Sequence, residues 1–567
     1  MDFKNAGSES TTIIGVIPQY PQHTKNNIFS EFRLPPIGIL SVLTNIRRDK
    51  KYDVYCIDEN NYRGPLDFTG TPDHDFLQRQ KPSKFVFLYG GMSSSILRMY
   101  SIAQTYKKFG SIVVAGGSHV DALPKEALSK GVDIIVHGEG EETSKEVLEA
   151  ILEKRPLEKI RGISFINERG EYIFTGRREP IKDLNMLESP DLTIVRHLKK
   201  RFTHIPLSRG RGCNFNCEFC VVHDQYGSYK SRAPDKVVED ITKYSDLGYK
   251  DFFFTDDNFA QNMEETIRLC RLIGDHKRLF KKKVHLNVQV RTEIAENEEL
   301  MDAMSYAGVK SLCIGYESPI NEELKAMRKG TTVELLEKRS RKLAKKFYIH
   351  GMFIFGYPSF KDSKFKSNLT LKEKAKVYMR FIRRAKIDSF QVMKAIPLPG
   401  SALREKLEKE NRIFPLEMVN WDKYDGVWLC YNPEPEGIDP YELQNLPNLL
   451  MKKRYLGSII GSSINYGNWI NWAWNATLGF PLQFSTFYSK MFIKNMVSGL
   501  KNQRFMETPS DEIRNLFYMP LLGAWKGIKR KWRNLAIKTY GGRVVSRWYK
   551  LYNSSDYKSR LESFFKC

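Results

Sequence analysis

The sequence predicts an α/β protein with a doubly wound parallel sheet at its N-terminus, a partial (β/α)6 barrel in its middle and a mainly helical C-terminal domain. Two series of β-branched runs that alternate with amphipathic segments predict the two sheets. A change of composition beyond Phe414, where all eight tryptophans of the chain lie, predicts the third part. The 567 residues suffice for several hydrophobic cores. We expect domains at residues 1–185, 195–413 and 414–567.

The first series runs from Thr11 to about Pro180 and is typical of a parallel sheet covered by helices. Its candidate strands are Thr12–Ile17, Val54–Ile57, Lys84–Tyr89, Ser111–Ala115 and Val132–Val136. Glycine-rich turns follow three of them, at Gly90-Gly91, Gly116-Gly117 and Gly138-Glu139-Gly140. Open α/β sheets bind ligands at the carboxyl ends of their strands, so these turns predict a ligand site.

The second series begins near Thr203, and helical segments of about a dozen residues separate most of its strands, as βα units require. The candidate strands are His204–Ser208, Asp251–Thr255, Val284–Val290, Lys310–Tyr316, Tyr348–Phe355 and Ser389–Ala395. Six units are too few to close a barrel of eight strands. We therefore expect an open, curved barrel with a lateral gap that admits a bulky substrate.

The C-terminal region combines aromatic, asparagine and basic residues. No residue between Tyr455 and Ser489 is charged, but asparagines interrupt the stretch, so we expect no membrane-spanning helix. The tail from Leu522 to Cys567 is strongly basic. Tryptophan and basic side chains together suit a membrane interface, which favours a peripheral membrane contact and a lipid-like substrate. The alternative is a helical cap whose tryptophans are buried.

Composition narrows the class of protein and its compartment. The 90 Lys and Arg residues outnumber 66 Asp and Glu residues, and the net charge of +24 favours anionic partners without choosing among them. Eight scattered cysteines form no disulfide framework, as expected in a reducing compartment. No basic segment followed by an apolar run opens the chain. We expect a cytoplasmic protein, or one that contacts the inner face of the membrane.

Three cysteines, Cys213, Cys217 and Cys220, follow the first strand of the second series with the spacing C-x3-C-x2-C. Three thiolates on one loop can bind three irons of a 4Fe–4S cluster and leave the fourth iron open. An open iron can bind the amino and carboxylate groups of S-adenosylmethionine. An electron from the cluster can then cleave the sulfonium bond to give a 5′-deoxyadenosyl radical. The alternative is a zinc site, for which His223 is the only close additional ligand.

Arg209 and Arg211 beside this motif can balance anionic charge. The cysteine spacing, with Phe219 just before the third cysteine, resembles the radical S-adenosylmethionine (radical SAM) superfamily. The chain is similar to the branch with an N-terminal cobalamin-binding domain, which includes the anaerobic magnesium-protoporphyrin ester cyclase and hopanoid-modifying enzymes. The resemblance implies a cobalamin-binding-like first domain, a radical SAM barrel, and a 4Fe–4S cluster, S-adenosylmethionine and cobalamin as cofactors. The matching stretches lie between about residues 12 and 405 and are Pro35-Pro36-Ile37-Gly38-Ile39-Leu40, Gly116-Gly117-Ser118-His119, Val132 to Glu141, Asp256-Asp257-Asn258-Phe259, Gly315-Tyr316-Glu317-Ser318 and Pro397-Leu398-Pro399-Gly400.

The resemblance also implies cofactor contacts at the mouth of the barrel. Phe219 is expected at the adenine, and Glu317 at the amino or ribose part of S-adenosylmethionine, where it is also a candidate catalytic residue. Asp256 and Asn258 are expected in the same mouth, with Gln289 as a weaker candidate. Each polar residue has a structural alternative as a helix cap or a hydrogen-bonded loop residue.

If cobalamin binds, the glycine-rich turns are expected to form its floor, because glycine permits the close approach of a broad ring. The expected contacts are Gly90, Ser93, Gly116, Gly117, His119, Gly138, Glu139 and Gly140. Mutase-type domains supply an axial histidine from an Asp-x-His-x-x-Gly motif, which this sequence lacks at the right place, so we expect a site without that ligand. The alternative is a domain that has kept the fold and lost the cofactor.

Cys430 is a candidate catalytic residue, because it lies where the third domain is expected to close over the barrel mouth. A thiol there can donate a hydrogen atom or bind a second metal centre. The alternative is a buried cysteine that packs as a small apolar residue.

These features predict a radical enzyme that methylates an unactivated carbon of a hydrophobic or lipid-like substrate, with flavodoxin or ferredoxin as a suitable electron donor. Radical cyclisation or carbon–carbon bond formation is the nearest alternative. Modification of tRNA is disfavoured, because only Cys56 precedes Cys213 where such enzymes carry three further cysteines. A non-catalytic sensor of cobalamin or of the cluster is a further alternative.

Overall fold

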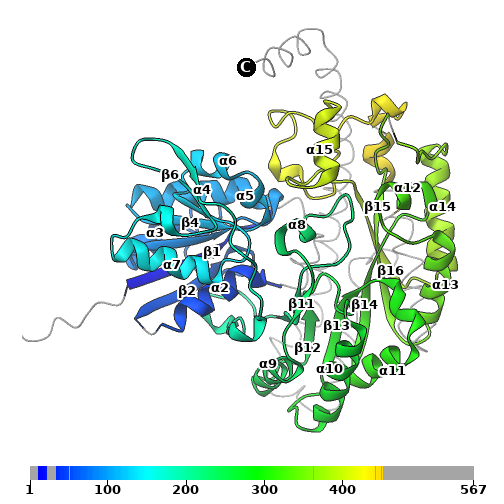
Figure 1. Cartoon of the computed structure of the whole chain (residues 1–567), viewed down its shortest axis with the longest axis horizontal. Helices are drawn as coiled ribbons and strands as arrows, with labels where there is room; N and C mark the ends of the chain where they lie inside the picture. Colours follow the sequence, from blue (N-terminus) through cyan, green and yellow to red (C-terminus); the bar gives the residue numbers. More distant parts are fainter. Residues whose placement is uncertain are drawn as a thin grey trace, which may run out of the picture.

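The computed structural model describes residues 11–21, 34–49, 51–361, 363–440, 442–447 and 450. Two sheets with their helices lie side by side, and the helix α8 (Val222–Tyr226) lies between them (Figure 1). The first sheet belongs to the N-terminal domain and the second to the barrel. The buried apolar residues of both sheets form one continuous core, so the two domains are packed together rather than tethered.

The first sheet has its strands in the order β7-β6-β5-β4-β3-β1-β2-β8. The strands are β1 (Thr11–Ile17), β2 (Tyr52–Asp58), β3 (Phe85–Tyr89), β4 (Ile112–Gly116), β5 (Ile134–Val136), β6 (Ile163–Ile166), β7 (Tyr172–Phe174) and β8 (Val195–Arg196). Strands β1 to β5 are parallel and coincide with the five predicted strands to within two residues at nearly every end. The order 2-1-3-4-5 reverses between β1 and β3, which confirms the doubly wound fold and puts its ligand edge at that point.

The first sheet differs from the prediction at its two edges. Strands β6 and β7 form an antiparallel hairpin beside β5, so the sheet is mixed rather than wholly parallel. Strand β8 pairs with β2 in parallel, which extends the first sheet to Arg196, past the expected boundary at residue 185. The three added strands have only two to four residues each, and the sequence pattern predicted none of them.

The helices of the N-terminal domain cover both faces of its sheet (Figure 1). They are α2 (Ile37–Arg47), α3 (His74–Gln80), α4 (Ile96–Lys108), α5 (Ser118–Ala122), α6 (Pro124–Ser129) and α7 (Glu141–Leu152). Helix α2 follows the Pro35-Pro36 pair and buries Ile39, Leu40 and Leu43. Because Leu43 lies three positions after Leu40 and four after Ile39, the three residues form one apolar face against the sheet.

The second sheet has six parallel strands in the order β16-β15-β14-β13-β12-β9. They are β9 (Ile205–Leu207), β12 (Asp251–Phe254), β13 (His285–Val290), β14 (Val309–Glu317), β15 (Tyr348–Phe355) and β16 (Ser389–Lys394). All six predicted strands are present, and β9 and β16 form opposite edges, which confirms the open six-stranded barrel. Along β15, buried residues alternate with partly exposed ones, as expected when one face meets helices and the other faces the barrel interior.

Most of the barrel helices begin at residues whose side chains cap them. The helices are α9 (Pro234–Asp246), α10 (Met263–Asp275), α11 (Glu298–Ala307), α12 (Asn321–Ala326), α13 (Val333–Leu343), α14 (Leu371–Arg384) and α15 (Ala402–Lys409). Asn262 caps α10 and Asn297 caps α11, while Thr370 and Glu373 form a capping box on α14. These caps fix where each helix leaves the ligand edge of the barrel.

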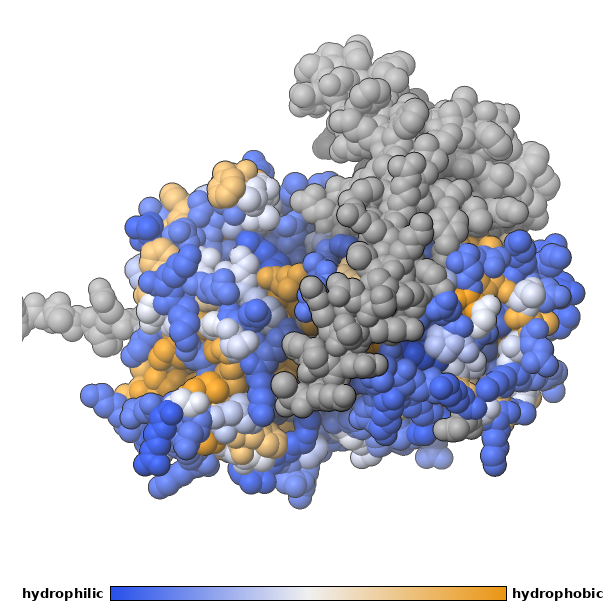
Figure 2. Space-filling model, turned by 90° about the horizontal axis from the view of Figure 1, so that it is seen from above, coloured by the Kyte–Doolittle hydropathy of each residue, from blue (hydrophilic) through white to orange (hydrophobic). Residues whose placement is uncertain are grey.

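The described part of the predicted third domain packs against the rest of the protein. Trp421, Tyr424, Leu429 and Cys430 are buried in the common core. The aromatic and basic segments beyond residue 450, on which the membrane prediction rests, lie outside the described residues. No helix in the described ranges is long and apolar enough to cross a bilayer. Figure 2 shows a mostly hydrophilic outer surface over the barrel, with apolar side chains in smaller groups.

Candidate functional site

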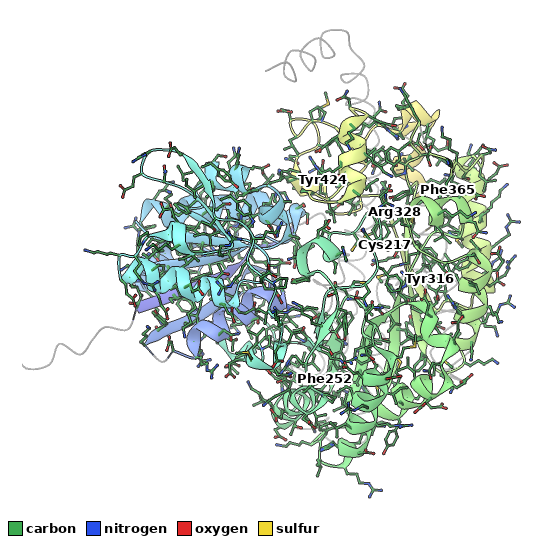
Figure 3. The ribbon with its side chains drawn as sticks, viewed as in Figure 1. Cys217, Phe252, Tyr316, Arg328, Phe365 and Tyr424 are labelled. Carbon is green, nitrogen blue, oxygen red and sulfur yellow. The ribbon has the colours of Figure 1, made fainter. Side chains whose placement is uncertain are left out.

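The three cysteines lie on the loop that leaves β9 at the ligand edge of the barrel. Two short strands, β10 (Gly210–Arg211) and β11 (Lys230–Ser231), pair antiparallel and close this loop at its base. All three thiols are free and half-buried. Cys217 lies in the middle of the molecule, near Arg328 (Figure 3). The loop therefore holds its thiols at the ligand edge of the barrel.

The surroundings of the thiols disfavour free thiolates. Burial raises the pKa of Cys213, and raises that of Cys220 to about 12. A metal that binds such thiols must supply the positive charge that removes their protons. Among the described residues, no three His, Cys, Asp or Glu side chains converge on a single ion position. Because a 4Fe–4S cluster binds each thiolate at a different iron, its ligands need not converge in that way.

Asp256 supports the cysteine loop from below. Its Oδ1 accepts the backbone N–H groups of Arg209 at 2.8 Å and Gly210 at 3.1 Å, and burial raises the pKa of the carboxyl to about 6. The Arg209 guanidinium is buried too, and it donates to the Phe259 carbonyl oxygen and the Thr266 hydroxyl rather than facing a cluster. In this structure Asp256 and Arg209 hold the loop in place, and their predicted roles as cofactor contact and in charge balance stay predictions.

Asn258 and Gln289 also act on the loop rather than on open space. Asn258 donates to the Gln261 Oε1 at 3.1 Å, and the same oxygen lies 3.6 Å from the Cys213 Sγ. Gln289 donates to the Asp256 carbonyl oxygen at 3.2 Å. The sequence thus placed both residues at the correct edge, but their side chains form a layer beneath the cysteines.

Glu218, which the sequence interpretation missed, anchors the loop on its other side. Its side chain is only 2% exposed, and it accepts hydrogen bonds from Tyr357 at 3.1 Å and from Lys406. Its backbone N–H donates to the Met327 carbonyl oxygen at 3.0 Å. Its position between two cysteines of a ligand loop could have indicated this role, because a charged side chain that is buried when the loop folds needs an oppositely charged partner.

Glu317 lies at the end of β14, as predicted. It has a left-handed backbone with φ of 60°, which costs free energy in a residue other than glycine, and it accepts a hydrogen bond from the Lys329 Nζ at 3.0 Å. A Cβ on Gly315 would lie 2.3 Å from the Glu317 Oε1, so the Gly-x-Glu spacing makes room for this carboxylate. Phe219, which lies on the cysteine loop, is half-buried and packs against the hydrophobic core.

Arg291 links β13 to the cysteine loop and was also missed from the sequence. Its guanidinium stacks 3.7 Å from the centre of the Phe215 ring and donates to the Lys329 carbonyl oxygen at 2.7 Å. Lys329, which donates to Glu317, is thereby connected through Arg291 to the cysteine loop. These contacts link the ends of β9, β13 and β14.

A cavity of about 290 Å³ lies between the two domains. The N-terminal domain contributes the predicted turns Gly116-Gly117 and Gly138-Glu139-Gly140, together with Gly91 and residues 34–39. The barrel contributes Gly210, Arg211 and Tyr226 from the cysteine loop, and Asp257. Asp257 is exposed towards this space, while the surrounding protein and the buried Asp256 raise its pKa to about 7. The ligand edges of the two sheets therefore share one cavity.

The glycines of this cavity leave a surface without side chains. Gly138 has φ of +66°, and no atom lies within 4 Å of the position that a Cβ would occupy, so this turn faces open space. Gly117 has φ of +120°, and a Cβ there would lie 2.5 Å from the Gly91 backbone nitrogen. Only glycine permits this close approach of two turns. The result is a stretch of the cavity lining that is formed by backbone atoms and carries no side chains.

Three of the predicted floor residues do not line the cavity. Gly90 is packed against Val120, where a Cβ would lie 2.6 Å from a methyl carbon. His119 is buried, with its Nδ1 2.9 Å from the Ser93 hydroxyl and its ring edge-on to Trp421 at 4.7 Å. His119 and Ser93 therefore connect the first domain to the segment after the barrel. The predicted ring contacts of Gly90, Ser93 and His119 stay predictions that the lining of this cavity does not support.

A buried Ser–His–Asp arrangement supports the Gly138 turn. The His137 Nδ1 lies 2.6 Å from Asp121, and its Nε2 lies 2.7 Å from the Ser164 hydroxyl. Ser164 has no exposed surface, and Asp121 also accepts the Gly138 backbone N–H. No substrate can reach this serine in the described structure, so the arrangement stabilises the turn and does not form a hydrolytic triad.

Glu139 and Cys430 are the last two of the predicted site residues. Glu139 lines the cavity, and its carboxylate pairs with Arg211 at 3.0 Å and Lys230 at 2.9 Å.

The Cys430 thiol is fully buried and lies 3.6 Å from the carbonyl oxygens of Lys423 and Trp428. Burial raises its pKa far above the ordinary range. The buried position favours the alternative of a cysteine that packs as an apolar residue, and the catalytic role stays a prediction.

Comparison with known proteins agrees with this geometry. The family model of the Radical SAM superfamily matches residues 207–371. An uncharacterized methyltransferase of Pyrococcus horikoshii is 26% identical over 69% of this chain and 82% of its own length. Bacteriochlorophyllide d C-12(1)-methyltransferase of Chlorobaculum tepidum is 26% identical over 77% of this chain and 86% of its own length.

The same arrangement of domains occurs in a solved structure. The radical SAM methyltransferase TsrM from Kitasatospora setae, with cobalamin and a 4Fe–4S cluster bound, superposes with a TM-score of 0.59 at 16% identity. The match covers 80% of this chain and 88% of that chain. The chain is therefore similar, in its cysteine motif, its relatives and its fold, to the cobalamin-binding radical SAM enzymes. The resemblance found in the cysteine motif is thereby confirmed, and the protein is a radical SAM enzyme.

Proposed function

We propose that this radical SAM enzyme uses cobalamin to transfer a methyl group to an unactivated carbon of a hydrophobic substrate. The observation that carries the proposal is the shared cavity, whose one side is the glycine surface and whose other side is the base of the cysteine loop. A methyl carrier on the first side would lie next to S-adenosylmethionine on the second. When bound, the cluster supplies the electron that cleaves S-adenosylmethionine, and cobalamin carries the methyl group.

The residues of the barrel suit a cluster and S-adenosylmethionine. Cys213, Cys217 and Cys220 are the proposed iron ligands, since they are free thiols on one loop. Glu317 presents a carboxylate at the same edge, held by Lys329, and can accept hydrogen bonds from the amino or ribose groups. Phe219 is the proposed contact of the adenine.

The residues of the first domain suit cobalamin without an axial histidine. The surface of Gly116, Gly117, Gly138 and Gly140 supports the proposed ring, because backbone atoms allow closer contact than side chains. His119, the one histidine among the predicted ring contacts, faces Trp421 instead. This agrees with the absence of an Asp-x-His-x-x-Gly motif.

A hydrophobic substrate is favoured by the interior of the barrel. Phe253, Cys313 and Leu34 form a small apolar cluster with Met352 packed against it, separate from the main core. Neighbours of these strand residues, such as Leu312 and Ile314, belong to the helix-facing core, so the cluster faces the opposite side of the sheet. Leu34 also lines the cavity. An apolar surface therefore leads from the cavity into the barrel.

Methyl transfer is favoured over cyclisation by the relatives described above. Both curated relatives are named methyltransferases and match over more than two thirds of each chain. One of them acts on bacteriochlorophyllide d, a large macrocycle, which supports a bulky and mainly apolar substrate for this enzyme. A separate electron donor, such as flavodoxin or ferredoxin, remains the proposed partner.

The test is anaerobic reconstitution of the full chain with iron, sulfide and cobalamin. We expect about four irons for each chain and one bound cobalamin, and 5′-deoxyadenosine after addition of S-adenosylmethionine and dithionite. Incubation with lipid and tetrapyrrole extracts and methyl-deuterated S-adenosylmethionine should then transfer a labelled methyl group to an apolar product, detected by mass spectrometry. Cleavage of S-adenosylmethionine without any cobalamin binding would contradict the proposal and favour a domain that has lost its cofactor.

A further inference from the structure

A buried network of four charged side chains connects the cysteine loop to the cavity floor. The Arg211 Nη1 lies 3.0 Å from the Glu139 Oε1, and its Nη2 lies 2.5 Å from the Glu141 Oε1. The Lys230 Nζ lies 2.9 Å from the Glu139 Oε2. Arg211 and Lys230 come from the barrel, whereas both glutamates follow β5 of the first domain. We call these four residues the interdomain clasp.

Both sides of the clasp are held by further hydrogen bonds. The Ser41 hydroxyl donates to the Glu141 Oε1 at 2.6 Å, and the Ile181 backbone N–H donates to the Glu139 Oε2 at 2.8 Å. The side chains of both glutamates are 3% exposed, and that of Arg211 is 15% exposed. Two positive and two negative charges balance, which a buried set requires. The clasp is therefore a built feature and not a chance surface contact.

The clasp joins two parts of the site that must face each other. Arg211 lies in β10, two residues before Cys213, and β10 pairs with the strand that carries Lys230. Between them, Gly212 has φ of +83°, and a Cβ there would lie 2.7 Å from the Ser228 carbonyl oxygen. This tight packing leaves little freedom between Arg211 and the first cysteine. On the other side, Glu139 belongs to the turn that lines the cavity.

The clasp contributes more to the geometry of the site than to the stability of the fold. A buried ion pair gains little net free energy over apolar residues of the same size, because desolvation offsets the attraction. Its hydrogen bonds are directional, however, and a guanidinium bridging two carboxylates fixes both distance and angle. A residue of this kind suits the alignment of two reacting groups that belong to different domains.

We propose that Arg211 is a positioning residue that sets the distance and angle between the cluster and the ligand in the cavity. This inference rests on the proposed function, because it takes cobalamin as that ligand. Lysine at position 211 keeps the charge but cannot bridge both carboxylates. Arg211→Lys therefore changes the alignment while the buried charges stay balanced.

The experiment compares two reactions that need no substrate. In the first, the reduced cluster gives one electron to S-adenosylmethionine, which yields methionine and, after hydrogen uptake, 5′-deoxyadenosine. In the second, cob(I)alamin takes the methyl group of S-adenosylmethionine with its own electron pair, which leaves S-adenosylhomocysteine. We expect Arg211→Lys to slow methylation of cobalamin at least about tenfold and to slow 5′-deoxyadenosine formation less than about threefold.

A second measurement reports alignment without turnover. Paramagnetic resonance of protein holding both the reduced cluster and cob(II)alamin shows their magnetic coupling, which depends on their separation and angle. Arg211→Lys should alter this coupling while iron content and cobalamin affinity stay within about twofold of the wild type. Two control variants are available: Arg178→Lys, whose partners Glu142 and Glu146 are on the surface, and Arg232→Lys, whose buried partner Asp240 lies within the barrel. Neither should change the ratio of the two rates.

The outcomes separate this inference from the proposed function. If the wild type fails to bind cobalamin or to cleave S-adenosylmethionine, the proposed function fails first. If the wild type performs both reactions and Arg211→Lys slows them in parallel with a loss of iron, Arg211 is merely structural and the inference is overturned. An unchanged ratio and an unchanged magnetic coupling overturn it as well.

Discussion

The two ligand edges of this protein differ in the kind of surface they offer. The edge of the first sheet is made of glycine turns and backbone atoms, whereas the edge of the barrel carries thiols, carboxylates and their cationic partners. The first suits recognition by shape, and the second suits the binding of a charged centre and a charged molecule. The difference shows that one cavity can divide its tasks between backbone and side chains.

Both edges nevertheless use a buried aspartate to hold a turn. Asp58, at the end of β2, accepts the Asn60 backbone N–H at 3.0 Å, and Asp256, after β12, accepts two backbone N–H groups of the cysteine loop. Burial raises the pKa of each carboxyl to about 6. The edges therefore differ in what they present and agree in how they are supported. Four predictions test this comparison.

The largest effect is expected at the barrel edge. Replacing Cys213, Cys217 or Cys220 with alanine should abolish the cluster and lower 5′-deoxyadenosine formation by about a thousandfold or more, because the cofactor performs the chemistry. Iron analysis and product chromatography measure both. Cobalamin affinity should fall much less, since its surface belongs to the other edge.

Cys430→Ala is the matched control for those variants. Its thiol is buried and packs as an apolar group, so the variant should keep the cluster and lose only about 1 kcal/mol of stability. Loss of product formation with an intact cluster would restore the catalytic role that the structure argues against.

The next largest effect is expected at Asp58, whose carboxyl holds a turn at the edge of the first sheet and makes the stability depend on pH. Because the folded-state pKa of Asp58 is raised from 3.8 to about 6, the folded protein binds this proton more tightly than the unfolded chain. The resulting stability is full below about pH 4 and is lost as the pH rises to about 6, by about 3 kcal/mol at most.

Asp58→Asn should remove this loss, so that the difference in unfolding free energy between variant and wild type changes over that pH window. Denaturant unfolding of the protein without cofactors, at several pH values from 4 to 7, measures it. The exposed Asp246→Asn serves as the control and should leave the slope unchanged. A variant with the wild-type slope would mean that the Asp58 carboxyl is not shifted.

A smaller effect is expected at Glu317. Glu317→Gln keeps the size of the side chain and removes its charge, so we expect about tenfold weaker binding of S-adenosylmethionine through the loss of charge-assisted hydrogen bonds. Equilibrium binding to the reconstituted cluster protein measures this. The exposed Glu298→Gln provides the comparison, and equal affinities in both variants would remove Glu317 from the site.

The smallest effect is expected for Gly138→Ala in the first edge. The left-handed conformation of this residue costs alanine about 1 kcal/mol, and its methyl group enters open space, so the fold should persist while cobalamin binds more weakly. Gly117→Ala should destabilise the domain more, because its methyl group meets the Gly91 backbone. Thermal unfolding and cobalamin titration distinguish the two. If neither variant changes cobalamin binding, the glycine surface is not its floor.

Local patterns in the sequence determined most of the framework. The eleven strands of the two series could be predicted because they are apolar or alternating runs separated by helical segments, and the turns after three of them needed glycine for reasons of backbone geometry. The spacing of Cys213, Cys217 and Cys220 likewise encodes a chemistry that requires one short loop. These features depend on residues close together in the chain.

Only the tertiary structure decided which side chains meet. Arg211 pairs with carboxylates 70 and 72 residues away, and Glu218 with a lysine 188 residues away. His119 is turned towards Trp421, and Cys430 is buried, although both sit in suggestive sequence contexts. Strand periods and turn residues express local preferences, whereas such contacts depend on how distant elements pack, which no local pattern in one sequence records.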